Sequence, residues 1–372
     1  MKSGRNLTKF LTIILLSLIN VVAYPCTTFV LRQQNKIVFG RNLDWITGSG
    51  LLMTNPRNVK KIALVDPSQK PIQWISKYGS ITFNQIGRDL PYGGMNETGL
   101  VVEHMTLEET EYPSKDDRYA ISAFQWIQFQ LDNFSKVEEV LNSDTLLRIV
   151  DATSKIHFLI CDRNGNAATI EFLHGKMVSH RQGSLPIQVL ANSTYNRSLD
   201  CYKSQENRES NRSLYNFCTA ADKIRNDKES SNDSLVENAF NILRSVSQGL
   251  GTKWSIVYDI TDMRVYFKIF ETPTIVGEQK IFIKQVGQAD LKFIDFNNFN
   301  FDCSKNVKVF NLNDNHLGKV DNLFLNYSTE INKEYITKAF KFFGDWGLNI
   351  NMEPEQIDYL AKYPESFICS DE

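Results

Sequence analysis

The sequence predicts an α+β protein in which antiparallel sheets pack against each other and against helices. Short strand-like runs dominate the first hundred residues, helical spacing follows between residues 118 and 141, and strand-like runs return from residue 156. Asn164-Gly165 lies in a short polar stretch between two apolar runs, which favours a β-hairpin there. Sheets with one face against helices and the other against a second sheet satisfy this order of elements.

The N-terminal third is expected to consist of strands. Residues 26–31 have strand-like alternation, and residues 37–39 follow a polar turn, so the two segments are expected to form a hairpin. The second strand runs into Gly40-Arg41-Asn42-Leu43-Asp44. Further strands are expected at residues 62–65, 81–83 and 100–105.

Helices are expected next. Apolar residues recur at helical spacing from Ile121 to Leu131, which predicts a helix that starts near Arg118. Ser135 with Glu138 matches a capping box for a second, shorter helix. The following strands are expected at residues 156–161, 167–172, 177–180 and 187–191.

In the second half of the chain, the polar residues 200–213 predict a surface loop, and residues 214–224 a helix. Ser234 with Glu237 opens a further helix. A late hairpin is expected over residues 254–270, and short helices at 335–343 and 354–363. We find no internal repeat and no linker that would mark a second domain.

The composition is that of an ordinary globular protein. Of the 372 residues, 42% are apolar and 23% are charged, and the net charge of −2 gives no basic field for nucleic acid or anionic lipid. The sequence has no Cys-x-x-Cys or His-Glu-x-x-His spacing, so we expect neither a metal site nor a cofactor.

Residues 1–23 have the three parts of a secretory signal. Lys2, Arg5 and Lys9 precede an apolar run that ends in small residues at Ala23. The run has roughly fourteen residues, too few to span a bilayer, so we expect an exported protein, periplasmic or secreted, without stable membrane insertion after signal removal. A lipoprotein anchor is the alternative, but its acylation needs a small residue before the cysteine, where Pro25 stands.

Cys26 is the candidate nucleophile. If residues 24–25 are removed after the signal, Cys26 becomes the first residue and gains a free α-amine. That amine titrates near pH ~7.7–8.0 and can take the thiol proton at neutral pH. An N-terminal cysteine therefore supplies both a nucleophile and its base.

Four segments occur in the order found in one enzyme family: residues 40–44, the run Tyr92 to Leu100, residues 191–195, and the hairpin 254–270. Together with Cys26 they resemble the choloylglycine hydrolase family of N-terminal-nucleophile (Ntn) hydrolases, which includes penicillin V acylases and bile salt hydrolases. The resemblance implies a four-layer αββα sandwich with two antiparallel sheets. It implies an Ntn-hydrolase domain over residues 26–303, with residues 304–372 as a C-terminal extension of that domain.

The resemblance also implies catalytic roles. Asp44 would hold the α-amine of Cys26, and Arg41 would lie close to the thiolate and favour its charged form. The side-chain amide of Asn192 would donate to the tetrahedral oxyanion, and the main-chain N–H of Thr106 would be the second donor.

Three further residues are candidates for supporting roles. Asn96, between Gly94 and Gly99, is expected to fix a tight turn rather than perform chemistry. The family usually has an arginine where this chain has Asn216, and Arg212, one helical turn away, is a possible substitute. This departure puts the electrostatics around the nucleophile in doubt.

The resulting hypothesis is an enzyme that hydrolyses linear, non-peptide C–N amides of small acyl-amide substrates. The alternatives are a dipeptidase of the other Ntn family that opens with a Cys-Thr-Thr strand, and a catalytically silent binding protein on the same scaffold. Bile salts, phenoxyacetyl penicillins and N-acyl homoserine lactones all remain candidate substrates, and a homo-oligomer remains open. Trp45, Tyr92 and Trp126 are candidates for lining an apolar acyl pocket.

An exported chain permits disulfides. Cys201 with Cys218, and Cys303 with Cys369, are conceivable pairs, but the sequence does not fix the connectivity.

Overall fold

The computed structural model describes residues 25–370 except 152–153, 206–207, 210, 228–233, 271–273, 277–278, 282–289, 346–347 and 349–351. The expected signal sequence, residues 1–23, and Tyr24 lie outside the described residues.

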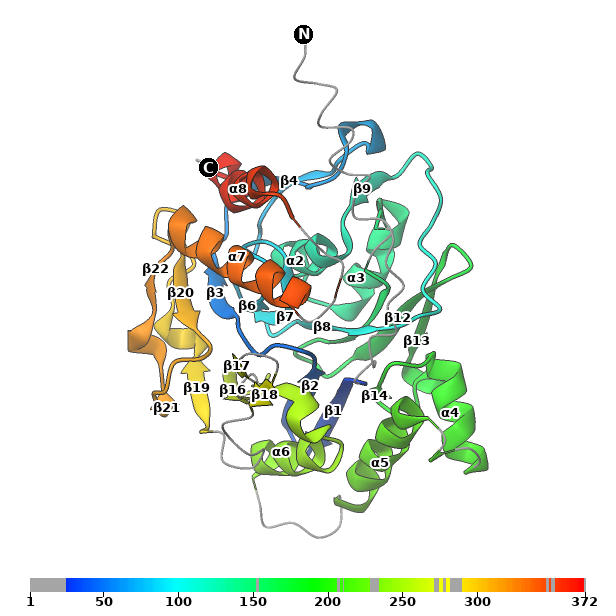
Figure 1. Cartoon of the computed structure of the whole chain (residues 1–372). Coiled ribbons are helices and arrows are strands. Elements are labelled where there is room, and N and C mark those ends of the chain that lie inside the picture. The colour runs from blue at the N-terminus through cyan, green and yellow to red at the C-terminus, as the bar shows by residue number, and fades with distance from the viewer. Residues whose placement is uncertain are drawn as a thin grey trace.

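Two large sheets lie face to face at the centre of the molecule (Figure 1). The first has seven strands and is antiparallel apart from the pairing of β19 with β21. Its strands, in spatial order, are β14 (Val189–Leu190), β1 (Thr27–Gln33), β2 (Lys36–Asp44), β15 (Thr252–Asp259), β16 (Arg264–Ile269), β19 (Lys292–Asp295) and β21 (Gly318–Lys319).

The second sheet has nine strands and is antiparallel throughout. In spatial order they are β13 (Lys176–Arg181), β12 (Ala167–Leu173), β11 (Ile156–Cys161), β8 (Val101–Thr106), β7 (Pro91–Asn96), β6 (Ser80–Asn84), β3 (Leu51–Asn55), β20 (Lys308–Asn311) and β22 (Leu325–Asn326).

Helices cover the outer face of each sheet. Helices α5 (Arg212–Asp227) and α6 (Leu235–Ser245) pack on β1 and β2, with α4 (Tyr195–Ser204) beside α5. On the other side, α2 (Ala123–Asn133) packs on β7 and β8, and α3 (Val137–Asn142), α7 (Thr329–Asp345) and α8 (Pro354–Lys362) lie on the same side of the molecule (Figure 1). The α+β prediction with its four αββα layers is therefore confirmed.

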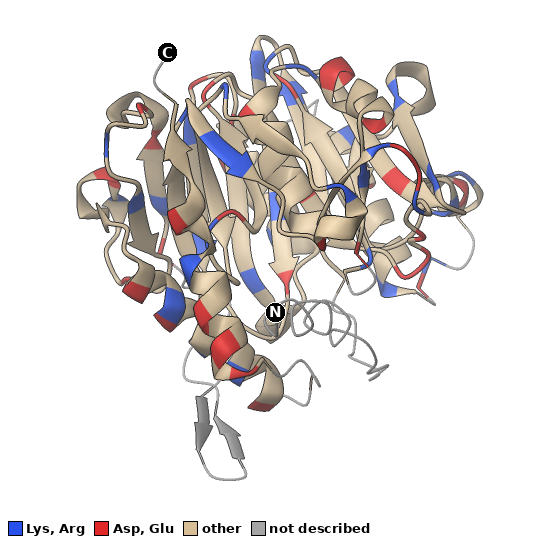
Figure 2. Ribbon diagram, turned by 90° about the horizontal axis from the view of Figure 1, so that it is seen from above, with Lys and Arg blue, Asp and Glu red and all other residues tan. Residues whose placement is uncertain are grey.

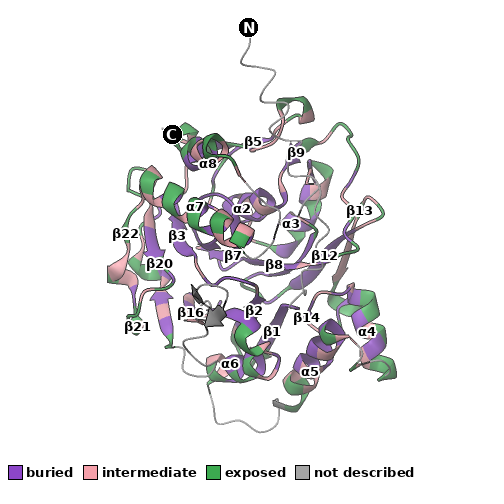
Figure 3. Ribbon diagram, viewed as in Figure 1, coloured by how far each residue is buried: buried purple, intermediate pink, exposed green. Residues whose placement is uncertain are grey.

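The main core fills the space between the two sheets, where Figure 3 shows continuous burial. The Phe83 ring of β6 lies 5.8 Å from the Trp254 ring and 6.2 Å from the Tyr258 ring of β15, and so joins the two sheets. Within the first sheet, Phe29 stands opposite Gly40, and a Cβ at Gly40 would come within 2.4 Å of the Phe29 ring. Only glycine leaves room for that ring.

Three small sheets complete the fold: β9 (Tyr119–Ile121) with β10 (Leu147–Ile149); β4 (Val59–Ile62), β5 (Gln73–Ile75) and β23 (Ile368–Cys369); and β17 (Thr274–Val276) with β18 (Gln279–Ile281). The helix expected near Arg118 thus begins only at Ala123, because residues 119–121 pair with β10. The residue that caps α3 is Glu139 rather than Glu138, since its carboxylate accepts from the backbone N–H groups of Ser135 and Lys136. Helix α4 occupies the start of the expected loop at residues 200–213.

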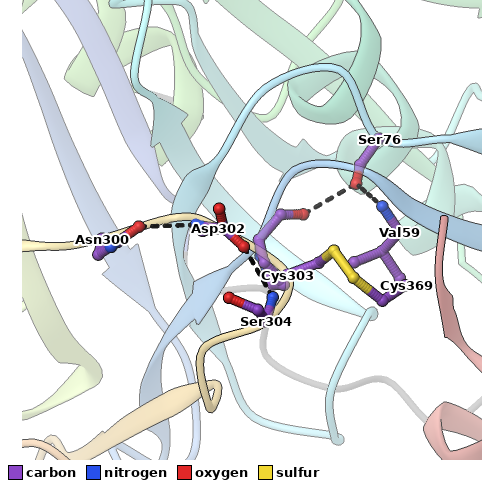
Figure 4. The surroundings of a disulfide bond; sticks show 8 residues. Val59, Ser76, Asn300, Asp302, Cys303, Ser304 and Cys369 are labelled. Carbon is purple, nitrogen blue, oxygen red and sulfur yellow. Dashed lines mark hydrogen bonds between the residues drawn. A yellow bond between two sulfur atoms is a disulfide. The ribbon is translucent and has the colours of Figure 1, made fainter. Parts of the chain in front are cut away.

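The C-terminal part adds β20 and β22 to the edge of the nine-stranded sheet, next to β3. A disulfide joins Cys303 to Cys369 (Figure 4). The sulfurs of Cys201 and Cys218 are 3.8 Å apart, at hydrogen-bond distance and not joined by a disulfide. Among the described residues, none of the helices has the length and apolar character needed to cross a membrane. Basic and acidic side chains are interspersed over the ribbon (Figure 2).

Candidate active site

Cys26 lies immediately before β1, at the point where the hairpin with β2 ends. The register places Thr27 opposite Asn42, so Cys26 comes beside the last residues of β2. Its Sγ lies 3.5 Å from the backbone nitrogen of Asp44 and 3.7 Å from the Asp44 carbonyl oxygen. The local pairing of two adjacent strands therefore brings the expected nucleophile and Asp44 together.

The Cys26 thiol is protonated in the full-length chain. Only 5% of the residue is exposed, and burial, followed by the Asp44 charge, raises the pKa of the thiol to about 12. The positive charge of Arg41 acts in the opposite direction and lowers this pKa, but it does not overcome burial. An additional base is needed to form the thiolate at neutral pH.

Asp44 carries an unsatisfied acceptor beside Cys26. Its Oδ1 accepts a hydrogen bond from the Thr252 hydroxyl, whereas its buried Oδ2 has no partner among the described residues. Burial is the main cause that raises the pKa of the Asp44 carboxyl to about 7. A buried acceptor without a donor is costly, so this oxygen is suited to accept a hydrogen bond from a further donor.

Arg41 is held by a fully buried ion pair that the sequence analysis missed. Its Nε lies 2.9 Å from Oε2 of Glu103 on β8, and its Nη2 donates to the His104 carbonyl at 3.2 Å. The Tyr258 hydroxyl donates to the same carboxylate. Burial raises the pKa of Glu103 to about 7, while Arg41 and Tyr258 act to lower it. The only signal in the sequence was an acidic residue inside an apolar strand.

Gly93 and Gly94, which follow Tyr92, stand at positions where packing leaves no room for a side chain. A Cβ at Gly93 would lie 2.1 Å from the Glu103 carboxylate, and one at Gly94 would lie 2.5 Å from the Ile81 carbonyl oxygen. A side chain at position 93 would therefore displace the carboxylate that orients Arg41. The glycine pair is thus linked to the electrostatics around Cys26.

Asn192 follows β14 in a turn that two buried side chains hold in place. His157 Nε2 lies 2.7 Å from the Ala191 carbonyl oxygen, and Glu171 accepts from the Tyr195 N–H at 2.8 Å. Oδ1 of Asn192 is buried and has no partner among the described residues. The sequence did not predict that His157 and Glu171 hold this turn, because both residues come from other strands of the fold.

Thr106 is the last residue of β8 and pairs with Ile156 of β11. The residue before it, Met105, reaches across the core, since the Thr28 hydroxyl lies 3.1 Å from its Sδ. Thr28 in turn pairs with Leu190, two residues before Asn192. The chain segments that carry Cys26, Thr106 and Asn192 therefore meet between the two sheets.

Asn216 of α5 is fully buried and holds the peptide bond before Cys26. Its Nδ2 donates to the Pro25 carbonyl oxygen at 3.1 Å and to Thr27 Oγ1 at 3.2 Å. Its Oδ1 accepts from Gln248 Nε2 at 3.4 Å, and Gln248 Oε1 accepts from Arg212 Nε at 3.1 Å. Arg212 thus contacts Gln248 rather than the thiol, although its charge acts against the rise that burial causes in the pKa of Asp44.

Asn96 makes the contacts of a residue that fixes a turn. Its Oδ1 accepts from the N–H groups of Thr98 and Leu100, and its Nδ2 donates to the carbonyls of Leu131 and Phe134. All of these contacts are structural, and the nucleophile is not among them.

The three candidate pocket aromatics lie in different places. Trp126 is 2% exposed and packs on Phe158 at 4.4 Å, in the core between α2 and the outer face of the nine-stranded sheet, so it does not line the site. Tyr92 belongs to the core cluster that contains Cys26; burial raises the pKa of its phenol, Arg41 acts to lower it, and a thiolate at Cys26 would raise it further. Trp45, next to Asp44, packs edge-on against Phe343 of α7 at 6.2 Å.

The site has no sign of metal chemistry in its side chains. No group of three or more histidine, cysteine, aspartate or glutamate side chains suited to a metal ion occurs in the described part of the chain.

Comparison with known proteins identifies the class. Residues 26–224 match the family model described as linear amide C–N hydrolases, choloylglycine hydrolase family. The chain belongs to this family, and its relatives are linear amide hydrolases.

Two relatives are penicillin V acylases. The penicillin V acylase of Pectobacterium atrosepticum is 26% identical over 317 residues, which are 71% of this chain and 83% of the relative. The structure of penicillin V acylase from Agrobacterium tumefaciens superposes with a TM-score of 0.67 at 25% identity and covers 82% of this chain and 98% of that one. A variant of conjugated bile acid hydrolase from Clostridium perfringens shares the fold, with a TM-score of 0.59 at 19% identity over 78% of this chain and 98% of that one.

Proposed function

We propose that this protein is an exported acylase in which Cys26, freed as the N-terminal residue, attacks the carbonyl carbon of a small acyl amide. The observation that carries the proposal is the unsatisfied Oδ2 of Asp44 beside Cys26. In the unprocessed chain the Cys26 nitrogen is a peptide nitrogen and has no basicity. Removal of residues 1–25 turns it into an amine whose ammonium form can donate to that oxygen.

The catalytic steps follow from this arrangement. The α-amine takes the thiol proton, Sγ bonds to the substrate carbonyl carbon, and the Asn192 side-chain amide and Thr106 N–H donate to the oxyanion. The C–N bond then breaks, and the leaving amine takes the proton from the α-ammonium. Water, deprotonated by the same amine, hydrolyses the thioester and releases a carboxylic acid.

Arg41 and Asp44 have complementary roles in this scheme. Arg41 lowers the pKa of the thiol, and Glu103 limits this effect because it pairs with the same guanidinium. Asp44 fixes the α-amine, whose positive charge in turn favours the carboxylate and offsets its burial. Processing therefore offsets the unfavourable burial of two groups in the full-length chain, the Cys26 thiol and the Asp44 carboxyl.

The structure offers a route for removing the last residues before Cys26. Cleavage after Ala23 would leave Tyr24-Pro25, and Asn216 already donates to the Pro25 carbonyl. In the proposed step, Sγ bonds to the Pro25 carbonyl carbon, the Pro25–Cys26 C–N bond breaks and the nitrogen takes the thiol proton. Water then hydrolyses the thioester to regenerate the thiol and release Tyr24-Pro25 with a free carboxylate.

For the substrate we propose an amide with an aromatic acyl group, as in penicillin V. Two observations support this choice: two relatives at 25% and 26% identity are penicillin V acylases, and the Tyr92 ring stacks on the Phe124 ring, with centroids 5.1 Å apart, in the core cluster that contains Cys26. Flat aromatic surfaces favour an aromatic acyl group over a polar one.

The test is a comparison of amine release from penicillin V, a glycine-conjugated bile salt and an N-acyl homoserine lactone by the mature enzyme, with Cys26→Ala as the control. We expect penicillin V to have the highest kcat/KM and the control to be inactive. A higher kcat/KM for the bile salt or the lactone would contradict the substrate assignment. Release from all three at control rates would contradict the proposed activity itself.

A further inference from the structure

A cavity separate from the candidate active site lies at the edge of the nine-stranded sheet that the C-terminal segment covers. Its volume is about 250 Å³, and none of its lining residues belongs to the candidate active site. Its walls come from the β3–β4 connection, the loop after β6, the chain before β20, and the residues that follow α8. The Cys303–Cys369 disulfide forms part of the wall, and Figure 4 shows it next to Val59, another lining residue that pairs with Cys369.

Arg88 is the central polar residue of this cavity. It is 9% exposed, and its guanidinium carbon lies 4.9 Å from the centre of the Tyr327 ring and 5.3 Å from that of the Phe367 ring. Its buried Nε has no hydrogen-bond partner, and no carboxylate of the described residues lies within 4.0 Å of its nitrogens. The hydroxyl of Tyr327, also a lining residue, is buried and meets no partner at good hydrogen-bond geometry, although Arg88 and Asn332 lie close enough to it to act against the rise that burial causes in its pKa.

The nearby carboxylates are already engaged. Asp89 and Asp132 favour the charged form of Arg88, but both bind the buried Lys61, at 2.7 and 2.8 Å. Asp132 also accepts from Trp74 Nε1 at 2.7 Å. These groups balance the charge at longer range, and the buried Nε of the guanidinium is left without an acceptor. An arginine cannot lose its proton, so burial without an acceptor is unfavourable.

The cavity is built on fixed elements. The backbone N–H of Arg88 donates to Asn332 of α7 at 3.0 Å, and Asn332 Nδ2 donates to the Ala361 carbonyl of α8 at 3.1 Å. Ser76 Oγ accepts from the Val59 N–H and donates to the Pro56 carbonyl (Figure 4). The lining is therefore preorganised rather than assembled from loose side chains.

We propose that this cavity binds a small organic carboxylate through Arg88. Two basic residues, Arg88 and Lys305, line the cavity and no acidic residue does, so its occupant is an anion. The planar guanidinium matches a carboxylate in a bidentate arrangement, and Tyr327 can donate a further hydrogen bond. Asn306, the disulfide and proline, valine and phenylalanine side chains form the rest of the wall; the exposed lining is mainly polar, and the apolar side chains offer contact to a small apolar body. The volume is below the about 300–1,000 Å³ of drug-sized ligand sites, so the occupant is small.

The experiment is calorimetric titration of the protein with benzoate, its neutral isostere benzamide, and sulfate. Benzoate is expected to bind with one-to-one stoichiometry at this cavity, with benzamide and sulfate weaker by about tenfold or more, because each lacks either the charge or the apolar body. Wild-type protein that does not bind benzoate, or binds benzamide or sulfate equally well, would overturn the assignment.

Variants locate the binding. Arg88→Gln should weaken benzoate by about tenfold or more, whereas Arg181→Gln, an exposed arginine on β13 at the opposite edge of the sheet, should leave it unchanged. Tyr327→Phe, which keeps the ring beside Arg88, should weaken benzoate by a smaller factor. Should Arg88→Gln not fold, Tyr327→Phe and Lys305→Gln decide the outcome. Unchanged affinity in all variants that fold would contradict the site.

Discussion

Asn216→Ala should slow the removal of Tyr24-Pro25 by about 10²–10³-fold, the usual effect of losing one donor to a developing oxyanion. The size of the effect follows from the contact. Asn216 Nδ2 donates to the Pro25 carbonyl at 3.1 Å, it is the donor that the described structure places on that oxygen, and the residue is fully buried. Water therefore cannot replace it.

The assay starts from purified chain that begins at Tyr24, released from a cleavable tag, and follows the intact mass with time. Lys223→Ala, an exposed residue of the same helix, is the matched control. Thermal unfolding of both variants separates a folding defect from a chemical one, since the loss of Asn216 also removes its hydrogen bonds to the Pro25 carbonyl and to Gln248 and costs about 1–3 kcal/mol.

Two results would refute this reasoning. Processing of folded Asn216→Ala at the parental rate would show that the amide does not act on the Pro25 carbonyl. Processing of Cys26→Ala at the parental rate would show that the thiol is not the attacking group. Turnover of amide substrates by mature Asn216→Ala should fall much less than processing does, because Pro25 is absent from the mature enzyme.

Three further predictions concern the same site. Cys26→Ala should abolish amide hydrolysis with the fold intact, and Cys26→Ser should keep trace activity at most, because a hydroxyl is far less acidic than a thiol; wild-type turnover in Cys26→Ala, measured with penicillin V, would point to another nucleophile. Asn216→Arg should lower the pKa of the Cys26 thiol, and Arg212→Ala should shift this pKa less, because Arg212 contacts Gln248 instead. The rate of thiol alkylation as a function of pH measures both shifts. An unshifted profile in Asn216→Arg would show that a positive charge at this position does not act on the thiol. Because burial raises the pKa of Asp44 from 3.8 to about 7, the folded chain binds that proton more tightly than the unfolded chain. The free energy of unfolding of the Cys26→Ala precursor should therefore fall as the pH rises from about 4 to about 7. Chemical unfolding at several pH values measures this slope, and adding Asp44→Asn should flatten it. An unchanged slope would contradict the burial argument.

The sequence predicts the parts of the site that depend on local pairing. Cys26, Arg41 and Asp44 lie on one hairpin, and the strand alternation of residues 26–31 and 37–39 is enough to place them at one end of it. The family resemblance adds Asn192 and Thr106, whose segments the structure brings to the same region between the sheets.

The residues that orient these groups could not be predicted, because they reach the site through packing of distant segments. Glu103 pairs with Arg41 across the two sheets, and its burial depends on the missing side chain at Gly93. Gln248 joins Asn216 to Arg212 from beyond the end of α6. A polar residue in an apolar strand signals that some partner exists, but its identity depends on tertiary structure.

Helix α4 shows the same limit at the level of secondary structure. Its sequence is polar, and only Tyr195, Ser198 and Cys201 are buried, at spacings of three residues. That pattern is weaker than the apolar stripe of α2. The helix is stabilised by the Thr194 side chain, which accepts from the Arg197 N–H, and by packing on α5.

The central claim is that Cys26 becomes the N-terminal residue and carries the acyl group. The most direct measurement is top-down mass spectrometry of the active enzyme, quenched during turnover of a slowly hydrolysed aromatic acyl amide. We expect a chain that begins at Cys26 and carries the acyl mass on that residue. Active protein that still retains Tyr24-Pro25, or an acyl group on any other residue, would contradict it.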